Sequence, residues 1–319
     1  DLVYSYDWWA PSRALTILPG EPNQVQPITE FPFWTFLFAD LHAHLMAIPF
    51  ALTAVGVSLG VVLNFTRLNS ARRLRSAEVS SWVMVALIGL IVGALRWINS
   101  WDYPVFLLMG AAAILIGEYA KERRVNGRAF AVGLLKIAVM GALSYAFFSV
   151  VAKNYSQSYN SVNRADQTTD LSDFLSHFGV FLFLIFGFLT FMLSRVIARD
   201  GNVRAIFFGS RRPSAADALP VTMALLLLAA AVIWAGTLAR WGVVWLSFAG
   251  VIGIVLCAVH ELRKPSPLAP VMLFIYTMTA LGLGLTGGVD LFTLEGDVGR
   301  TNTVFKFYLH VWLLWGIVA

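Results

Sequence analysis

The chain has 319 residues, of which 58% are hydrophobic and only 13% are charged. Soluble domains have about 45–50% apolar and roughly 25% charged residues, so this composition excludes an ordinary soluble domain. The net charge of +5 does not indicate nucleic-acid binding, because the basic residues are divided among short segments between hydrophobic runs.

The hydrophobic runs predict an all-α integral membrane protein, a polytopic helical bundle with about nine spans. The runs last about 17–24 residues and lack the alternation of a membrane β-barrel. We expect spans at 44–64, 81–98, 103–119, 129–152, 174–195, 218–238, 241–259, 268–286 and 303–319. The first residue is not methionine and the last run stops at the chain end. We therefore expect a segment of a longer protein, truncated at its C-terminus.

Residues 1–43 are too polar to span a membrane. They contain acidic residues, an arginine and five prolines before Phe33, together with several tryptophans and phenylalanines. Amphipathic rings favour the membrane interface. We therefore expect residues 1–43 to form a long interfacial first outer loop that carries acidic residues, and residues 44–319 to form the transmembrane bundle.

The distribution of charge predicts the orientation of the spans. The loops 65–80, 120–128, 196–217 and 260–267, with their span ends, hold 15 Lys/Arg against 6 Asp/Glu. The alternate loops hold 7 Lys/Arg against 12 Asp/Glu, and Lys136 lies within a span, close enough to its end to snorkel. The positive-inside rule places the first set in the cytoplasm. The prediction is a multipass protein of the inner (cytoplasmic) membrane, with its site on the extracytoplasmic face.

The stretch ITEFPFWTFLFADLHAHLMAIPF (28–50) places Asp40, His42 and His44 where the chain enters the membrane. In a helix Asp40 and His44 would share a face, whereas in an extended chain all three residues would share one. Either geometry brings a carboxylate and an imidazole together, and a divalent cation is a further alternative for this trio. The plainer interpretation is that Asp40 caps the first span while both histidines lie at headgroup level.

Two further groups of polar residues fall on the predicted outer face. The short turn NSWDYP contains Asn99, Trp101 and Asp102, which suit a sugar or serve as an interfacial belt. The stretch EGDVGRTNTVFK offers acids and bases at the mouth of the last span, where arginine and lysine bind phosphate well. Its candidates, with two basic residues from other outer loops, are Glu295, Asp297, Arg300, Lys306, Arg13 and Arg240.

Four runs resemble a known family. YSYDWWAPSR (4–13), TEFPFWTFLFADLHAHLMAIPF (29–50), NSWDYP (99–104) and GRTNTVFKFYLHVWLLWG (299–316) are similar to the YYY family of multipass bacterial and archaeal membrane proteins. That family in turn resembles the GT-C glycosyltransferases. The resemblance implies a GT-C-like fold and transfer of a sugar from a polyprenyl-phosphate donor to an unidentified acceptor on the outer face.

The resemblance also implies roles for residues. An acid of the first outer loop would be the catalytic base, namely Asp40, or Glu30 or Asp7 in its place. Asp40-Leu41-His42 resembles the start of an Asp-x-His-Pro-Pro sequence, although Ala43-His44 replaces the two prolines. The phosphate would be bound by the basic residues Arg300, Lys306, Arg13 and Arg240. The sugar would be held by His42, His44, Asn99, Trp101, Asp102, Glu295 and Asp297.

No cofactor is required for this chemistry, although a divalent cation at Asp40, His42 and His44 is compatible with it. The expected partners are the lipid bilayer and the polyprenyl-phosphate donor, without nucleic acid. Three alternatives stay open: a non-catalytic scaffold or subunit of a larger membrane complex, a transporter, and a metal-dependent hydrolase.

Overall fold

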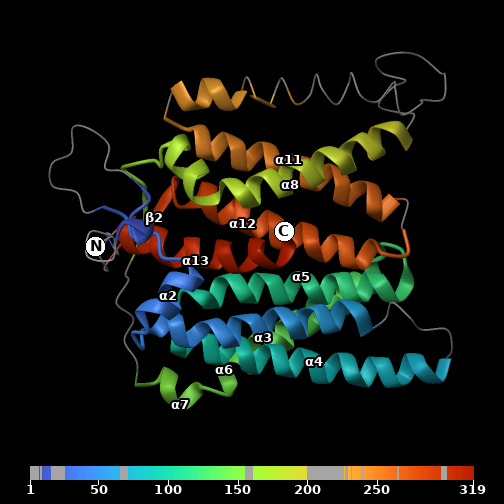
Figure 1. Ribbon diagram of the computed structural model, residues 1–319. Coiled ribbons are helices and arrows are strands. Elements are labelled where there is room, and N and C mark those ends of the chain that lie inside the picture. Colours follow the sequence, from blue (N-terminus) through green and yellow to red (C-terminus); the bar gives the residue numbers. More distant parts are fainter. Residues whose placement is uncertain are drawn as a thin grey trace. The chain divides into compact units, whose positions relative to one another are not determined.

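The computed structural model describes the chain except for residues 1–6, 8, 16–25, 65–70, 155–160, 200–225, 227–228, 231, 239, 264–265 and 296–299. The described part is almost entirely helical (Figure 1). Its longer helices are α3 (Ala43–Asn64), α4 (Ala71–Ile98), α5 (Asp102–Glu122), α6 (Gly127–Ala146), α8 (Leu171–Arg199), α11 (Gly242–Arg263), α12 (Ala269–Gly288) and α13 (Arg300–Val318). Shorter elements are α2 (Pro32–Phe38), α7 (Ser149–Ala152), a 3-10 turn (Ala10–Ser12) and the strands β1 (Ser161–Arg164) and β2 (Phe292–Glu295).

Among the described residues, seven helices are long and apolar enough to cross a membrane. They lie in α3, α4, α5, α6, α8, α11 and α12, which confirms the prediction of a polytopic all-α membrane protein. Helix α13 coincides with the expected last span, but polar residues such as Arg300, Asn302 and Lys306 lower its hydropathy. About half of the span expected at 218–238 lies outside the described residues. In the described part of this span, residues 232–238 are helical.

The span expected at 129–152 is too long. Helix α6 ends at Ala146, and residues 149–152 form the separate short helix α7. The Phe148 N–H bonds to the carbonyl of Tyr145, three residues back, so the regular four-residue ladder is interrupted. Hydrophobic residues continue past this break, which is why the sequence pattern extends beyond the helix.

The chain divides into two compact units. Unit 1 comprises residues 1–34, 158–260 and 282–319, and unit 2 comprises residues 35–157 and 261–281. Each has its own core. Unit 1 buries aromatic residues of α8 and α13, including Phe174, Phe178 and Tyr308, whereas unit 2 buries aliphatic residues of α4 and α5 such as Ile88 and Met109.

Close helix packing in unit 2 depends on small residues. Gly89 and Gly93 are one turn apart on α4, and a methyl group added there would lie 2.9 Å from the Met140 carbonyl oxygen and 2.6 Å from the Ser144 carbonyl oxygen of α6. This is the small-xxx-small pattern that lets helix backbones approach each other in membranes. Gly117 on α5 approaches Val61 on α3 in a similar way. Both residues lie in the C-terminal halves of their helices, so α3 and α5 run parallel.

A buried ion cluster joins α4, α5 and α6. The Lys136 Nζ is bound by Glu118 Oε1 at 2.5 Å, Glu78 Oε1 at 2.8 Å and Ser81 Oγ at 3.0 Å. Lys121 Nζ bonds to the other Glu78 oxygen at 2.6 Å. The expectation that Lys136 snorkels is wrong, because its side chain is fully buried and all three ammonium protons have acceptors inside the protein.

In unit 1, the polar segment before α8 is tied to the segment before α13. β1 pairs antiparallel with β2, with Ser161 opposite Glu295 and Arg164 opposite Phe292. In the same unit, Trp312 Nε1 of α13 donates to His177 Nε2 of α8 at 2.8 Å. Phe31 of the N-terminal segment stacks on the Trp312 ring. These contacts fix three distant segments of the chain to one another.

Substitution of Gly93 by alanine tests the close approach of α4 and α6. The added methyl group would meet a backbone oxygen, so we expect Gly93→Ala to destabilise the protein by about 1–3 kcal/mol. Thermal unfolding of the detergent-purified protein measures this. Gly141→Ala is the matched control, because nothing lies within 4 Å of that position. Equal thermal unfolding midpoints for Gly93→Ala and Gly141→Ala would contradict the close approach of α4 and α6.

Lys136→Met tests the ion cluster. It leaves the Glu118 carboxylate buried without its counter-charge, which costs about 3–5 kcal/mol in comparable sites. Lys121→Met removes a partner of Glu78 from an ion pair whose two side chains are 31% and 30% exposed, so a loss below about 1 kcal/mol is expected. Both variants are compared by thermal unfolding, and the double variant Lys136→Met, Glu118→Leu should recover most of the loss.

Candidate active site

The corner between α2 and α3 places a carboxylate beside an imidazole. Helix α2 ends at Phe38, and Ala39 adopts a left-handed conformation with φ 54° while its N–H bonds to the Thr35 carbonyl. The His42 N–H then bonds to the Asp40 carbonyl at 2.7 Å, which closes a three-residue turn. This turn brings the side chains of Asp40 and His42 together just before α3 begins.

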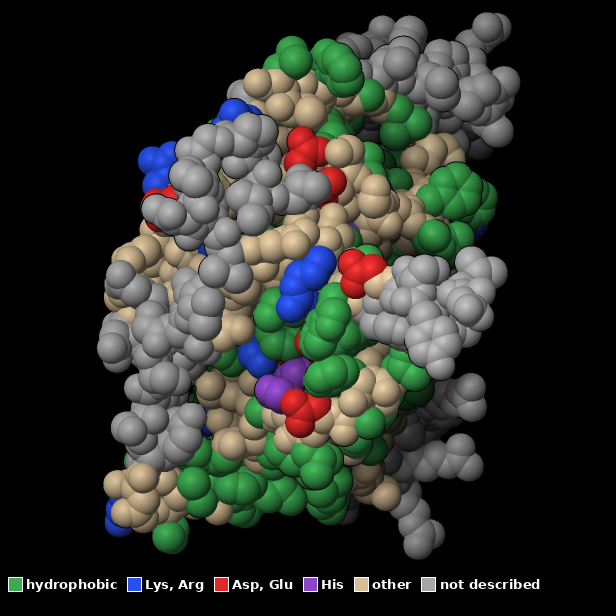
Figure 2. Space-filling model, turned by 60° about the vertical axis from the view of Figure 1, so that its left-hand side comes forward, with side chains coloured by type: hydrophobic (Ala, Val, Ile, Leu, Met, Phe, Trp, Pro, Cys, Tyr) green, Lys and Arg blue, Asp and Glu red, His purple; other side chains and the backbone are tan. Residues whose placement is uncertain are grey.

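Asp40 Oδ2 lies 2.5 Å from His42 Nδ1, and the side chains are 49% and 59% exposed, respectively. Within the described part of the chain, His42 Nε2 has no hydrogen-bond partner. His44 has its ring 5.4 Å from that of His42, but it lies on the buried face of α3 and is only 4% exposed. Figure 2 shows histidine and acidic side chains together on one face of the protein, among hydrophobic ones. The arrangement is thus an accessible Asp–His pair with a buried second histidine.

The structure does not bring these three residues into a metal-binding arrangement. Among the described residues, no group of three or more histidine, cysteine or acidic side chains is placed to hold an ion. The metal alternative for Asp40, His42 and His44 therefore gains no support from the geometry.

The NSWDYP turn lies at the same end of unit 2, because α3 and α5 run parallel and both begin there. Asn99 Nδ2 donates to Asp102 Oδ1 at 2.8 Å, and both side chains are buried. Trp101 is also buried, with 6% of its surface exposed, so its ring is covered by protein rather than open for stacking on a sugar. The turn supports the start of α5 beneath the surface.

Unit 1 contains a separate buried polar cluster around Arg300, the first residue of α13. Arg300 Nη2 donates to Asp290 Oδ1 and to Thr169 Oγ1, both at 2.8 Å. Asp290 also accepts hydrogen bonds from the Thr169 N–H and hydroxyl. Burial raises the pKa of the Asp290 carboxyl, while the charge of Arg300 and the Thr169 hydrogen bonds act in the opposite direction.

Within this cluster, Arg300 bonds to Asp290 and Thr169 through a single guanidinium nitrogen, Nη2. The Nε atom is buried and, among the described residues, has no hydrogen-bond partner. Asp290 and Thr169 therefore fix the orientation of Arg300 and leave other N–H groups unused. Sequence reasoning missed both partners. Asp290 follows the end of α12 as the lone acid of an apolar stretch, which was the available signal.

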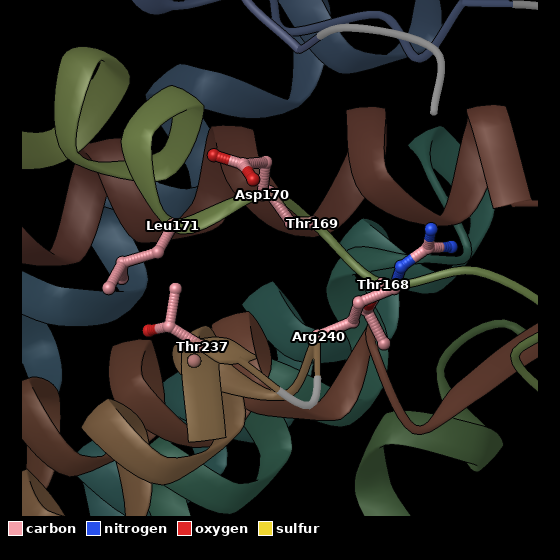
Figure 3. Close-up of a pocket in the computed structure, with 7 residues that line it drawn as sticks. Thr168, Thr169, Asp170, Leu171, Thr237 and Arg240 are labelled. Atoms are coloured by element: carbon pink, nitrogen blue, oxygen red, sulfur yellow. The ribbon is translucent and has the colours of Figure 1, made fainter. Parts of the chain in front are cut away.

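Arg240 lies beside the same loop. It adopts a left-handed backbone conformation with φ 63° and lines a cavity of about 30 Å³ with Thr168, Thr169, Asp170, Leu171, Thr237 and Gly242. Figure 3 shows the side chain of Leu171 extending toward Thr237 while the Arg240 side chain passes Thr168. The cavity has room for one or two water molecules only, so it does not accommodate a sugar.

The structure gives the following local contacts for the other predicted site residues. Arg13 Nη1 bonds to the carbonyl and hydroxyl of Ser12, and Asp7 accepts from the Trp9 N–H. Lys306 Nζ lies 4.2 Å from the ring centroid of Phe305, and Glu30 is half-buried. Asp297 and the Glu295 side chain lie outside the described residues.

The apolar helices and the accessible Asp–His corner define a multipass membrane protein with a polar site at one end of its first described span. The chain belongs to a family of uncharacterized membrane proteins, DUF2298, whose sequence profile matches residues 2–315. This confirms the resemblance to the YYY family. A search of curated proteins and a search of solved structures found no match.

Thr169→Val tests the cluster around Arg300. The substitution keeps the shape of the side chain but removes the hydroxyl that bridges Asp290 and Arg300, leaving buried polar atoms unsatisfied. We expect a loss of about 1–3 kcal/mol in thermal unfolding. Thr168→Val is the control, since the neighbouring half-buried hydroxyl makes no hydrogen bond to the described residues. A midpoint equal to that of the control would show that the bridge does not stabilise the fold.

Proposed function

We propose that the protein is a membrane glycosyltransferase of the GT-C type, which moves a sugar from a polyprenyl-phosphate donor to an acceptor hydroxyl on the extracytoplasmic face. The observation that carries this proposal is the Asp40–His42 pair, whose 2.5 Å contact lies in an exposed corner. The family resemblance supports the same reaction class, and the charge distribution supports the assignment of the face.

The pair has the geometry of a general base. A carboxylate bound to Nδ1 fixes the orientation and tautomer of an imidazole, so that Nε2 is the atom that accepts a proton. In this structure Asp40 occupies Nδ1 and Nε2 is open within the described part. The proposed role of His42 is therefore proton acceptor, and Asp40 is the residue that positions it. This revises the expectation that Asp40 itself is the base.

The proposed step is a displacement at the anomeric carbon. The acceptor oxygen forms a bond to that carbon while its proton passes to His42 Nε2. The bond between the carbon and the phosphate oxygen breaks, and the phosphate leaves with the bonding electron pair. Proton transfer by a positioned base contributes typically 10²–10⁴-fold to such a rate.

Arg300 is a basic group suited to phosphate. Arg300 is held through Nη2 by Asp290 and Thr169, while its Nε–H is unpaired within the described part. Arginine binds phosphate oxygens through its N–H groups, and Asp290 and Thr169 do not use the Nη1 group of Arg300. We propose that Arg300 binds the phosphate of the donor.

Sugar transfer by the purified, vesicle-reconstituted protein tests the proposed base. Asp40→Asn and His42→Gln should each lower kcat about 10²–10⁴-fold with a polyprenyl-phosphate sugar donor. Asp166→Asn, an exposed acid of another loop, is the control and should retain wild-type turnover. Wild-type turnover by the Asp40→Asn, His42→Gln double variant would overturn the proposal.

A further inference from the structure

His42 stands at the end of the exposed stripe of α3. Met46, Phe50 and Thr53 follow it at intervals of one, two and about three turns, and all three are exposed. The opposite face carries His44, Ile48 and Ala51, which are buried. The Met46 N–H bonds to the His42 carbonyl, so His42 directly precedes the first turn of α3 and lies one turn before Met46.

The exposed stripe of α3 is a lipid-facing surface. The helix has 22 residues, and at 1.5 Å per residue it is about 33 Å long, close to the hydrocarbon thickness of a bilayer. Its exposed apolar side chains thus form a stripe with the length and composition that suit contact with acyl chains. His42 directly precedes the helix, which places its imidazole at the depth of the lipid headgroups.

The surface next to His42 is apolar as well. Leu41, between the two residues of the pair, is 78% exposed, and Leu37 and Phe38 at the end of α2 are each more than half exposed. Five residue steps separate Phe38 from Ala43, which limits the connection to about 18 Å even when extended. The exposed Leu37 and Phe38 side chains thus belong to a segment that lies within this distance of the first residue of α3.

From this continuity we infer that the hydroxyl deprotonated by His42 is carried by a lipid, which reaches the imidazole sideways from the bilayer along the stripe of Leu41, Met46 and Phe50. The inference rests on the proposed function, since it names the acceptor class for that base. A lipid-borne acceptor presents its hydroxyl at headgroup depth, where Nε2 is exposed. A water-soluble acceptor would gain nothing from an apolar surface around the base.

The depth of the site is measured without any enzymatic assay. A polarity-sensitive fluorophore is attached to Leu41→Cys or Met46→Cys in the full chain, reconstituted in phosphatidylcholine vesicles. The native Cys257 is 1% exposed and should not react, which the unlabelled wild type checks. Quenching by nitroxides on lipid headgroups or acyl chains, together with protection from aqueous iodide, is expected. Val162→Cys on β1, 64% exposed, is the control and should be quenched by iodide.

The acceptor class is measured with one sugar alcohol carrying either a dodecyl or a methyl group. The inference predicts a kcat/KM at least about tenfold higher for the dodecyl acceptor, because its chain concentrates it beside the stripe. Equal values for the two acceptors, or iodide quenching at positions 41 and 46 as strong as at 162, would overturn the inference. The proposed function fails by a different result, namely transfer that survives loss of Asp40 and His42.

Discussion

The fold depends on one constraint: a bilayer has no water to satisfy polar groups, so the protein must pair them internally. Lys136 shows how this is met, because two carboxylates and a hydroxyl bind its ammonium group. Asp290 is satisfied in the same way by Arg300 and Thr169. These polar contacts connect parts of the chain that are distant in the sequence. His42 differs from these groups, because its side chain is 59% exposed and its Nε2 has no partner within the described part of the chain.

Much of the helical layout follows from the sequence, because backbone groups in lipid require helices and their apolar runs are easily seen. The prediction for α5 was accurate since Pro104 marks a first helical turn. It failed for α6, where apolar residues continue beyond the break after Ala146. The hydrophobicity of a residue reflects whether it is surrounded by lipid, protein or water. The end of a helix is set by local hydrogen bonds, which the hydrophobic pattern does not show.

The candidate site was only partly predictable. The sequence places Asp40 and His42 near each other, but their pairing depends on where α3 starts and on the turn between Asp40 and His42. The pairing of Asp290 with Thr169 could not be found, because the two residues are 121 positions apart and their contact exists only in the folded chain. Trp101 illustrates the converse, since an aromatic residue in a polar turn suggests a binding surface but proves to be buried.

The central claim is that His42, held by Asp40, faces a lipid-borne group at the membrane surface. An electron cryomicroscopy map of the full chain in a lipid nanodisc, containing the dodecyl acceptor, tests it most directly. We expect an acceptor oxygen within about 3 Å of His42 Nε2 and an intact Asp40–His42 contact. A map in which protein side chains cover Nε2, or in which the acceptor binds elsewhere, would contradict it.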